Sequence, residues 1–174
     1  MAKRREDEVP DFLGIARQLK IDVVRYAAIT GLNFFIDSFQ KQGFTNTSFE
    51  AWQKRSNDSR PGGAILVKSA FLRNSLKVME RSSDAILYGS NAPHAKIHNE
   101  GGVINMTLTK KARKYFWFMY YATNDTRYKW MAISKKDHLT IKIPKRQFIG
   151  HSETLMGDLE TWLKNEIENR FKNS

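Results

Sequence analysis

Apolar residues recur every three to five positions between Phe12 and Phe39, with polar residues between them. This spacing keeps one face of a helix apolar, because an α-helix completes a turn every 3.6 residues. Asp11 is suited to cap the first turn, and Gly43 provides a C-terminal stop. We therefore predict a long amphipathic helix here, with Gly31 as a point where it kinks or splits.

The pattern then changes to a polar connector at residues 45–63, which is rich in Ser, Asn, Asp, Pro and Gly. Phe49 and Trp52 are expected to anchor this connector to the core. Residues 64–78 return to a helical spacing and predict a short helix. Two short strands are predicted around a Ser-Ser-Asp turn, at residues 78–81 and 85–89.

The second half of the chain begins with alternation instead of helical spacing. Residues 102–109 alternate polar and apolar positions, as a half-buried strand does, and residues 139–143 follow a strict period of two. The aromatic run at 115–122 fits either a strand buried on both faces or a helix. A last apolar stripe, from Leu155 to Phe171 after a capping Ser152, predicts a C-terminal helix.

These elements predict an α+β fold class. Its expected parts are a long N-terminal helix, an antiparallel curved sheet and a C-terminal helix packed on the sheet. With 174 residues, 41% of them hydrophobic, the chain is long enough to form a core of its own. We expect a flexible charged tail at residues 1–10 and a single domain at 11–174. No apolar stretch has the length of a membrane-spanning helix.

Charge is unevenly distributed along the chain. The net charge is +11, and residues 103–150 hold eleven Lys or Arg residues against two acids, Asp125 and Asp137. Residues 151–174 hold five acids against three bases. A basic segment attracts nucleic acid or a negatively charged protein, although a well-solvated surface explains it equally well. Because there is no cysteine, disulfides, thiolate metal sites and cysteine nucleophiles are excluded.

The segment HAKIHNEGG, at residues 94–102, raises the question of a metal site. His94 and His98 are four residues apart, so on a helix they point the same way and can share a zinc ion. The zinc-protease signature, however, has glutamate directly after its first histidine, where this chain has Ala95. A short helical turn ended by glycines is the alternative, and a metal-dependent hydrolase is the weakest functional hypothesis. The candidate third ligands are Glu100, His138 and His151.

Lysines and arginines cluster in three stretches with aromatic residues between them. Interleaved rings and cations suit single-stranded nucleic acid, because rings stack on bases and cations hold phosphates. No RNA-recognition, zinc-finger or helix-turn-helix pattern accompanies them. A basic nucleic-acid-binding protein is therefore the second functional hypothesis. The stretches are residues 110–114, 135–136 and 142–146.

Three sequence blocks stand out in order: ILVKSAFLRNSLKV (65–78), LYGSNAPHAKIHNEGG (87–102) and IPKRQFIG (143–150). The first resembles the leucine, small residue, leucine-arginine-x-serine segment of the phage virion morphogenesis family, also called tail completion proteins. The second resembles the family's glycine-small residue block, which continues to tyrosine-alanine and isoleucine-histidine or glutamate before glycine. The third resembles its closing isoleucine-proline-x-arginine-x-phenylalanine-leucine-glycine, which a final helix follows. His94 departs from the pattern, since the family usually has tyrosine there.

The resemblance implies a structural virion protein of a tailed bacteriophage or prophage, made in the bacterial cytoplasm and located at the head–tail junction or tail end. It would act in tail completion or head–tail joining as a neck or terminator-like ring subunit. Its partners would be other head–tail junction or tail proteins, with DNA nearby but no sequence-specific binding. No catalysis, metal or cofactor is implied, and no phosphate-binding loop or complete nucleophile elbow occurs. Residues 103–138 exceed the expected length and are a candidate for an inserted β-hairpin.

Basic side chains are the candidate assembly contacts. Pro144 ends a strand, so Lys145 and Arg146 are expected in an exposed turn at an assembly surface. The basic segment and the acidic final helix can serve as complementary faces between subunits of a ring. The candidate interface residues are Lys110, Lys111, Arg113, Lys114, Lys142, Lys145 and Arg146.

Overall fold

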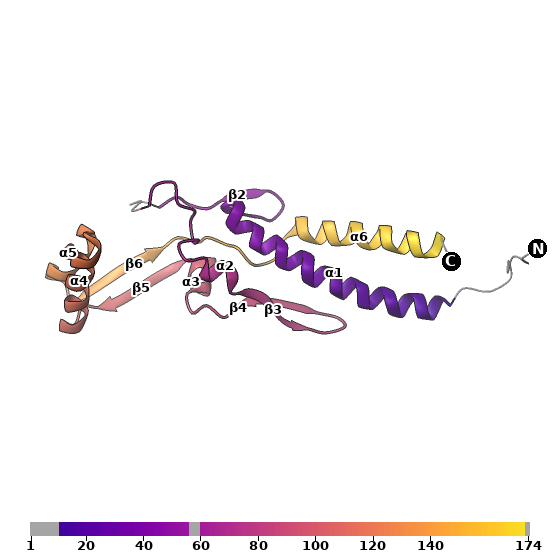
Figure 1. The fold of residues 1–174 in the computed structure, drawn as a ribbon, viewed down its shortest axis with the longest axis horizontal. Helices are drawn as coiled ribbons and strands as arrows, with labels where there is room; N and C mark the ends of the chain where they lie inside the picture. Colours follow the sequence, from indigo (N-terminus) through magenta and orange to yellow (C-terminus); the bar gives the residue numbers. More distant parts are fainter. Residues whose placement is uncertain (1–10, 56–59, 173–174) are drawn as a thin grey trace, which may run out of the picture. The chain divides into compact units, whose positions relative to one another are not determined.

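The computed structural model describes residues 11–55 and 60–172, so the charged tail expected at residues 1–10 lies outside the described residues (Figure 1). The fold class is α+β, as predicted, with a long N-terminal helix, small antiparallel sheets and a C-terminal helix. The described strands form three two-stranded sheets instead of one curved sheet. The helices are α1 (Phe12–Lys41), α2 (Phe71–Asn74), α3 (Ala95–Glu100), α4 (Lys110–Thr123), α5 (Thr126–Ile133) and α6 (Glu153–Lys172), and the strands are β1 (Gly43–Thr45), β2 (Phe49–Ala51), β3 (Leu76–Arg81), β4 (Ile86–Ser90), β5 (Gly102–Thr107) and β6 (His138–Ile143).

The chain divides into two compact units, each described by itself below. Unit 1 contains the described residues up to Ala95 and from Arg146 onward, and it includes α1, β1 to β4, α2 and α6. Unit 2 is Lys96–Lys145 and includes β5, α4, α5 and β6.

Helix α1 has the predicted start but ends slightly earlier than predicted. Asp11 caps it, because its side chain accepts a hydrogen bond from the Gly14 backbone N–H at 2.9 Å. The last turn ends at Lys41, where Gln42, not Gly43, adopts the left-handed conformation with φ of 59°. The helix is continuous through Gly31, and the Tyr88 ring occupies the space that a side chain would fill there.

The core of unit 1 forms around the C-terminal half of α1. Trp52 anchors the connector as predicted, with its indole N–H donating to the Gln147 carbonyl at 2.6 Å. Phe49 does not, because 49% of it is exposed on β2. The buried residues of this core are Phe35, Phe39, Phe44, Trp52, Leu72, Leu76, Ala92, Phe148 and Leu155.

The helix predicted for residues 64–78 is wrong for most of its length. Only α2 is helical, and β3 has already begun at Leu76. Leu66 and Ala70 adopt positive φ angles of 60° and 55°, which interrupt a right-handed helix. The Gln42 side chain also accepts a hydrogen bond from the Ile65 N–H at 2.5 Å, which fixes the backbone in an irregular path.

Helix α1 lies between α6 on one side and the β3–β4 hairpin on the other (Figure 1). The β3–β4 strands pair near the predicted positions, from Leu76 with Ser90 to Arg81 with Ile86. Helix α6 begins against the β1–β2 turn, where the Thr154 N–H donates to the Asn46 carbonyl at 3.0 Å. It then runs along α1, so its main partner is that helix and not the sheet on which it was expected to pack.

Unit 2 is a two-stranded ribbon that carries a helical hairpin. The ribbon pairs β5 with β6, from Gly102 with Ile143 to Thr107 with His138. Helices α4 and α5 occupy the chain between these strands, so the segment considered for a β-hairpin is largely helical. A small core holds them together, with Leu108, Phe116 and Ala132 buried.

Candidate interaction surfaces

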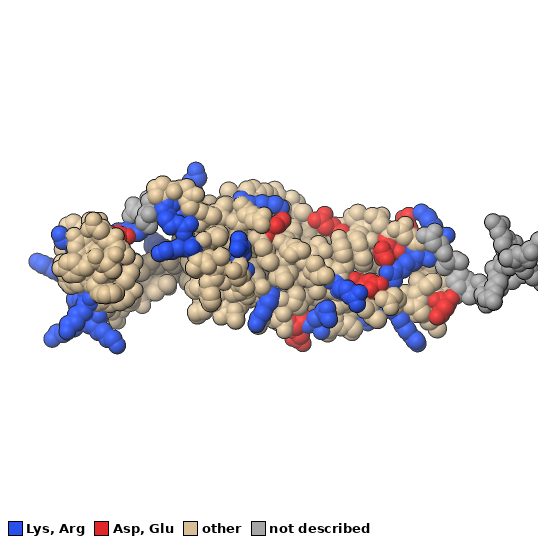
Figure 2. Space-filling model, viewed as in Figure 1, with Lys and Arg blue, Asp and Glu red and all other residues tan. Residues whose placement is uncertain are grey.

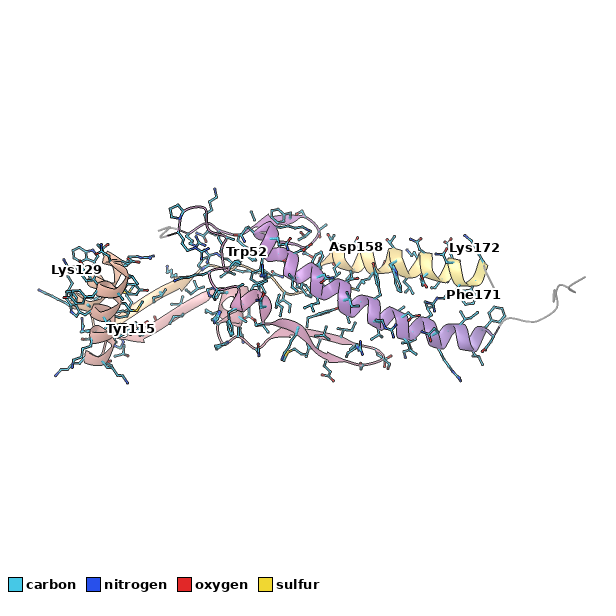
Figure 3. All side chains as sticks on the ribbon, in the orientation of Figure 1. Trp52, Tyr115, Lys129, Asp158, Phe171 and Lys172 are labelled. Atoms are coloured by element: carbon cyan, nitrogen blue, oxygen red, sulfur yellow. The ribbon has the colours of Figure 1, made fainter. Side chains whose placement is uncertain are left out.

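The outer face of α4 exposes a row of aromatic rings. Tyr115, Phe118 and Tyr121 are 54%, 66% and 77% exposed, and their spacing of three residues places them on one side of the helix. Lys111 and Lys114 extend this row toward the start of α4, and both are exposed. We call these five residues the α4 face. Tyr115 and Lys129 mark the two helices of the hairpin in Figure 3.

Positive charge is concentrated at the start of α4. Its first turn contains no acidic residue, although the N-terminus of a helix carries partial positive charge and favours acids. Lys110, Lys111 and Lys114 are all exposed there, and Figure 2 shows blue side chains extending from this part of the molecule. Lysines in this position disfavour the helix slightly, so an anionic partner would relieve a local repulsion.

Arg113 belongs to the same basic cluster but does not extend into solvent with it. Its guanidinium donates to the Ala132 carbonyl at 3.1 Å, to the Ser134 carbonyl and to the Lys136 carbonyl at 2.9 Å. These bonds close the C-terminal end of α5 against α4. Arg113 is therefore a structural residue of unit 2, whereas Lys110, Lys111 and Lys114 are available for contacts.

The structure corrects one expectation about the segment after Pro144. Lys142 and Lys145 are exposed, as expected, but Arg146 is only 9% exposed. Its Nε and Nη2 atoms donate to the Gln53 carbonyl at 3.1 and 3.0 Å. Burial, and to a smaller extent the Arg55 guanidinium, lowers the pKa of Arg146. The chain turns inward here because Phe148, two residues later, is fully buried in the core of unit 1.

The histidine segment forms a short helix that is followed by two glycines. This is the arrangement expected as the alternative to a metal site. Helix α3 begins after His94, whose ring centroid lies 5.8 Å from that of Phe71. Gly101 has φ of +74°, and a side chain on it would come within 2.8 Å of the Lys145 backbone nitrogen. Among residues 11–55 and 60–172, no three His, Asp or Glu side chains form a group that could hold a metal ion.

The other two histidines have neighbours of their own. The His138 ring nitrogen is 3.4 Å from the Thr107 hydroxyl, and the His151 Nε2 atom is 2.8 Å from the Glu153 carboxylate. Both pairs are exposed, and each joins residues that are adjacent along a strand pair or a helix start. These contacts orient surface side chains and supply no third ligand for His94 and His98.

A hollow of about 490 Å³ in unit 1 was missed by the sequence analysis. It lies between the N-terminal half of α1 and the end of the β3–β4 hairpin, and we call it the basic hollow. One sequence signal points to it, since Ile21 is an apolar residue outside the stripe that predicts the helix, with Arg17 and Arg25 four positions to either side. The lining residues are Arg17, Lys20, Ile21, Val24, Arg25, Arg81, Ser82 and Ser83.

The outer side of α6 is a second surface that periodicity alone did not identify. Met156 is 45% exposed, and Glu153 and Glu160 are exposed with it. Gly157 has no atom within 4 Å of the position that a Cβ would take. Glycine in the interior of a helix costs about 1 kcal/mol relative to alanine, and nothing in unit 1 requires its small size here. These four residues are named the α6 outer face.

The described residues thus present several exposed surfaces that are candidates for contacts with other molecules. No helix among the described residues has the length and apolar character needed to cross a bilayer. The model of the phage virion morphogenesis family matches residues 37–168, and this chain belongs to that family. The match indicates a structural role in building a phage virion and agrees with the resemblance found in the sequence. No curated protein and no solved structure matches the chain.

Proposed function

We propose that this protein completes the tail or joins it to the head of a tailed bacteriophage, as a subunit of a ring at the neck or tail end. The observation that carries the proposal is the exposed α4 face on a chain of the phage virion morphogenesis family. Protein interfaces are enriched in Tyr, Trp and Phe, and a few such residues carry most of the binding energy. Phe118 and Tyr121, each more than half exposed, have the character of such residues.

The partner of the α4 face would be another head–tail junction or tail protein with an acidic rim around an apolar centre. Lys111 and Lys114 would meet the rim, and Tyr115 and Phe118 would enter the centre. Opposite charges across an interface increase the association rate and exclude wrong partners. Lys142 and Lys145, exposed on and beside β6, extend the same positive charge along unit 2.

The test replaces Phe118 and Tyr121 with serine in a phage or prophage that encodes this protein. We expect separate heads and tails by electron microscopy and a fall in infectious titre of at least about tenfold, the effect of 1.4 kcal/mol at an interface. Phe49→Ser is the matched control, because Phe49 is 49% exposed on β2 of unit 1. Normal joined particles from the double variant, with the same protein level, would contradict the proposal.

Nucleic-acid binding is the second candidate function, because the α4 face also combines rings with lysines. Single-stranded nucleic acid would be held by such a surface with strong salt dependence. Retention of the purified protein on DNA of unrelated sequence should then fall steeply with salt. Lys111→Glu with Lys114→Glu should abolish that retention. If wild-type protein shows no such retention while the Phe118 and Tyr121 variant still blocks joining, the protein-partner function is favoured.

A further inference from the structure

We infer that the basic hollow of one copy receives the α6 outer face of the next copy, so that identical subunits associate through two different surfaces. This inference rests on the proposed function, because it identifies the surfaces through which the subunits of the proposed ring would meet. It concerns unit 1 only, and it identifies the occupant as a second copy of this chain.

The basic hollow is lined by both apolar and cationic side chains. Ile21 and Val24 are its apolar residues, and Ile21 is 53% exposed. Two of the cations already have carboxylate neighbours, as Lys20 lies 2.9 Å from Asp84 and Arg25 lies 3.9 Å from Asp22. Within residues 11–55 and 60–172, Arg17 and Arg81 form no ion pair. The lining therefore retains two positive charges for an acidic partner.

The α6 outer face has the complementary features. Glu153, Met156 and Glu160 are spaced three or four residues apart, and Gly157 is next to Met156 and four residues after Glu153, so all four lie on one side of the helix. Met156 is an exposed apolar side chain flanked by carboxylates, which complements a hollow lined by apolar and cationic side chains. Gly157 leaves the helix backbone open to close approach, and this explains a glycine that unit 1 itself does not need.

The two surfaces lie on opposite sides of unit 1. Val24 lines the hollow and Tyr26, two residues later, stacks on Trp162 of α6 at 4.0 Å between ring centroids. Two residues correspond to roughly 200° around a helix, so the hollow and α6 are on opposite sides of α1. On α6, Glu160 is likewise two residues from Trp162 and faces away from α1. Figure 1 shows the same order, with α1 between α6 and the β3–β4 hairpin.

Surfaces placed in this way cannot be joined within one copy and suit a heterologous contact between copies. Such contacts form a ring when the rotation between neighbours closes, and an open filament when it does not. An acidic segment of a different protein is the competing occupant of the hollow. The glycine and the exposed methionine favour α6, because a chance acidic helix elsewhere would leave Gly157 and Met156 without a partner.

Complementary charge reversals test the contact in the purified full-length protein. We expect Arg17→Glu with Arg81→Glu, and separately Glu153→Lys with Glu160→Lys, to reduce self-association about tenfold or more by sedimentation. Each variant keeps one intact surface, and the two reversed surfaces are complementary to each other, so an equimolar mixture should form mixed oligomers that neither variant forms alone. The chain that carries all four reversals should associate again. Asp158→Lys is the control, since Asp158 is exposed and lies two residues before Glu160, roughly 200° around α6, so it should change nothing.

Disulfide trapping gives a second readout that does not depend on affinity, because the chain has no cysteine of its own. Ile21→Cys combined with Met156→Cys should oxidise to a series of covalent oligomers, both in solution and in particles. Ile21→Cys combined with Asp158→Cys should remain monomeric on the same gel. Unaltered association after the reversals, equal trapping by both pairs, or a monomeric wild-type protein without trapping in particles would each overturn the inference. Rings seen in particles without Ile21–Met156 trapping would overturn it and leave the proposed function standing.

Discussion

Arg146 and Lys145 are neighbours in sequence with opposite environments. Arg146 is buried and donates twice to the Gln53 carbonyl, whereas Lys145 is exposed. We expect Arg146→Gln to lower the free energy of unfolding by about 2 kcal/mol, because hydrogen bonds from a charged group contribute about 1.5–3 kcal/mol. Lys145→Gln should stay within about 0.5 kcal/mol of wild type, as surface substitutions usually do.

Denaturant titration of both variants measures this difference. Equal stability of the two variants would show that the Gln53 contact contributes nothing. The comparison of the two variants also shows which residue suits assembly experiments, since loss of assembly in an Arg146 variant would reflect a damaged core. Lys145→Glu is the informative reversal for an assembly role of this turn.

Replacement of glycine by alanine is expected to have opposite effects on stability at two positions within helices. At Gly31, an added Cβ would come within 2.6 Å of the Tyr88 ring carbon Cζ, and overpacking of this kind costs about 1–3 kcal/mol. At Gly157 the space is open, so alanine should stabilise α6 by up to about 1 kcal/mol. We therefore expect Gly31→Ala to lower the melting temperature and Gly157→Ala to raise it by about 2–4 °C. Calorimetry of both variants checks the two signs, and a lower melting temperature for Gly157→Ala would mean that the open space is filled within unit 1.

Helix α1 and helix α6 are held together by a charged clamp as well as by stacked rings. The Arg170 guanidinium lies 2.7 Å from the Asp22 carboxylate and 2.7 Å from the Glu166 carboxylate. Hydrogen bonds from Arg170, and then from Gln18, lower the pKa of Asp22 below its ordinary value. A lowered folded-state pKa stabilises the fold above the ordinary pKa of an aspartate, and this contribution is lost as the pH falls through the folded value.

Asp22→Asn should therefore be less stable than wild type at neutral pH, with a smaller difference in strong acid. Thermal melts between neutral pH and strong acid measure this convergence. Asp158→Asn is the matched control on α6, since Asp158 is exposed and outside the clamp. A constant gap between Asp22→Asn and wild type at all pH values would show that the ionised carboxylate is not responsible.

The elements with clear periodicity were predicted, and those decided by distant contacts were not. Helix α1, strands β5 and β6 and helix α6 all follow from spacing, and Asp11 caps α1 as expected. Residues 64–78 failed because a helical spacing of leucines says nothing about Gln42, whose side chain holds Ile65 from 23 positions away. The burial of Arg146 depends in the same way on Gln53, 93 positions earlier.

The aromatic run could have been assigned to a helix from local signals. Thr109 caps α4 by accepting a hydrogen bond from the Ala112 N–H at 3.2 Å, and a threonine before such a run is a helix-start signal. The structure agrees with this signal, since Phe116 is buried whereas Tyr115 and Phe118 are exposed, which does not fit a strand buried on both faces. Which rings face outward follows only from the packing of α5 on α4, so the α4 face required the structure.

At the scale of the whole chain, the two units separate two kinds of surface. Unit 1 contains the basic hollow and the α6 outer face, which are assigned to contacts between copies. Unit 2 carries the α4 face, which is assigned to a different partner protein. Loss of one unit's surface should therefore remove one activity and spare the other, and the topology provides a clean place to test this.

Thr107 and His138 are directly paired at the end of the β5–β6 ribbon. Residues 108–137 can thus be replaced by Asn-Gly, which forms the two-residue turn that closes antiparallel strands. The core of unit 1 contains none of the removed residues, so cooperative unfolding of unit 1 should persist, although a bare two-stranded ribbon is marginally stable. We expect this deletion to keep self-association and Ile21–Met156 trapping but to block head–tail joining. Joined, infectious particles from the deletion would show that the α4 face is dispensable, whereas loss of self-association from a folded unit 1 would place the contact between copies in unit 2.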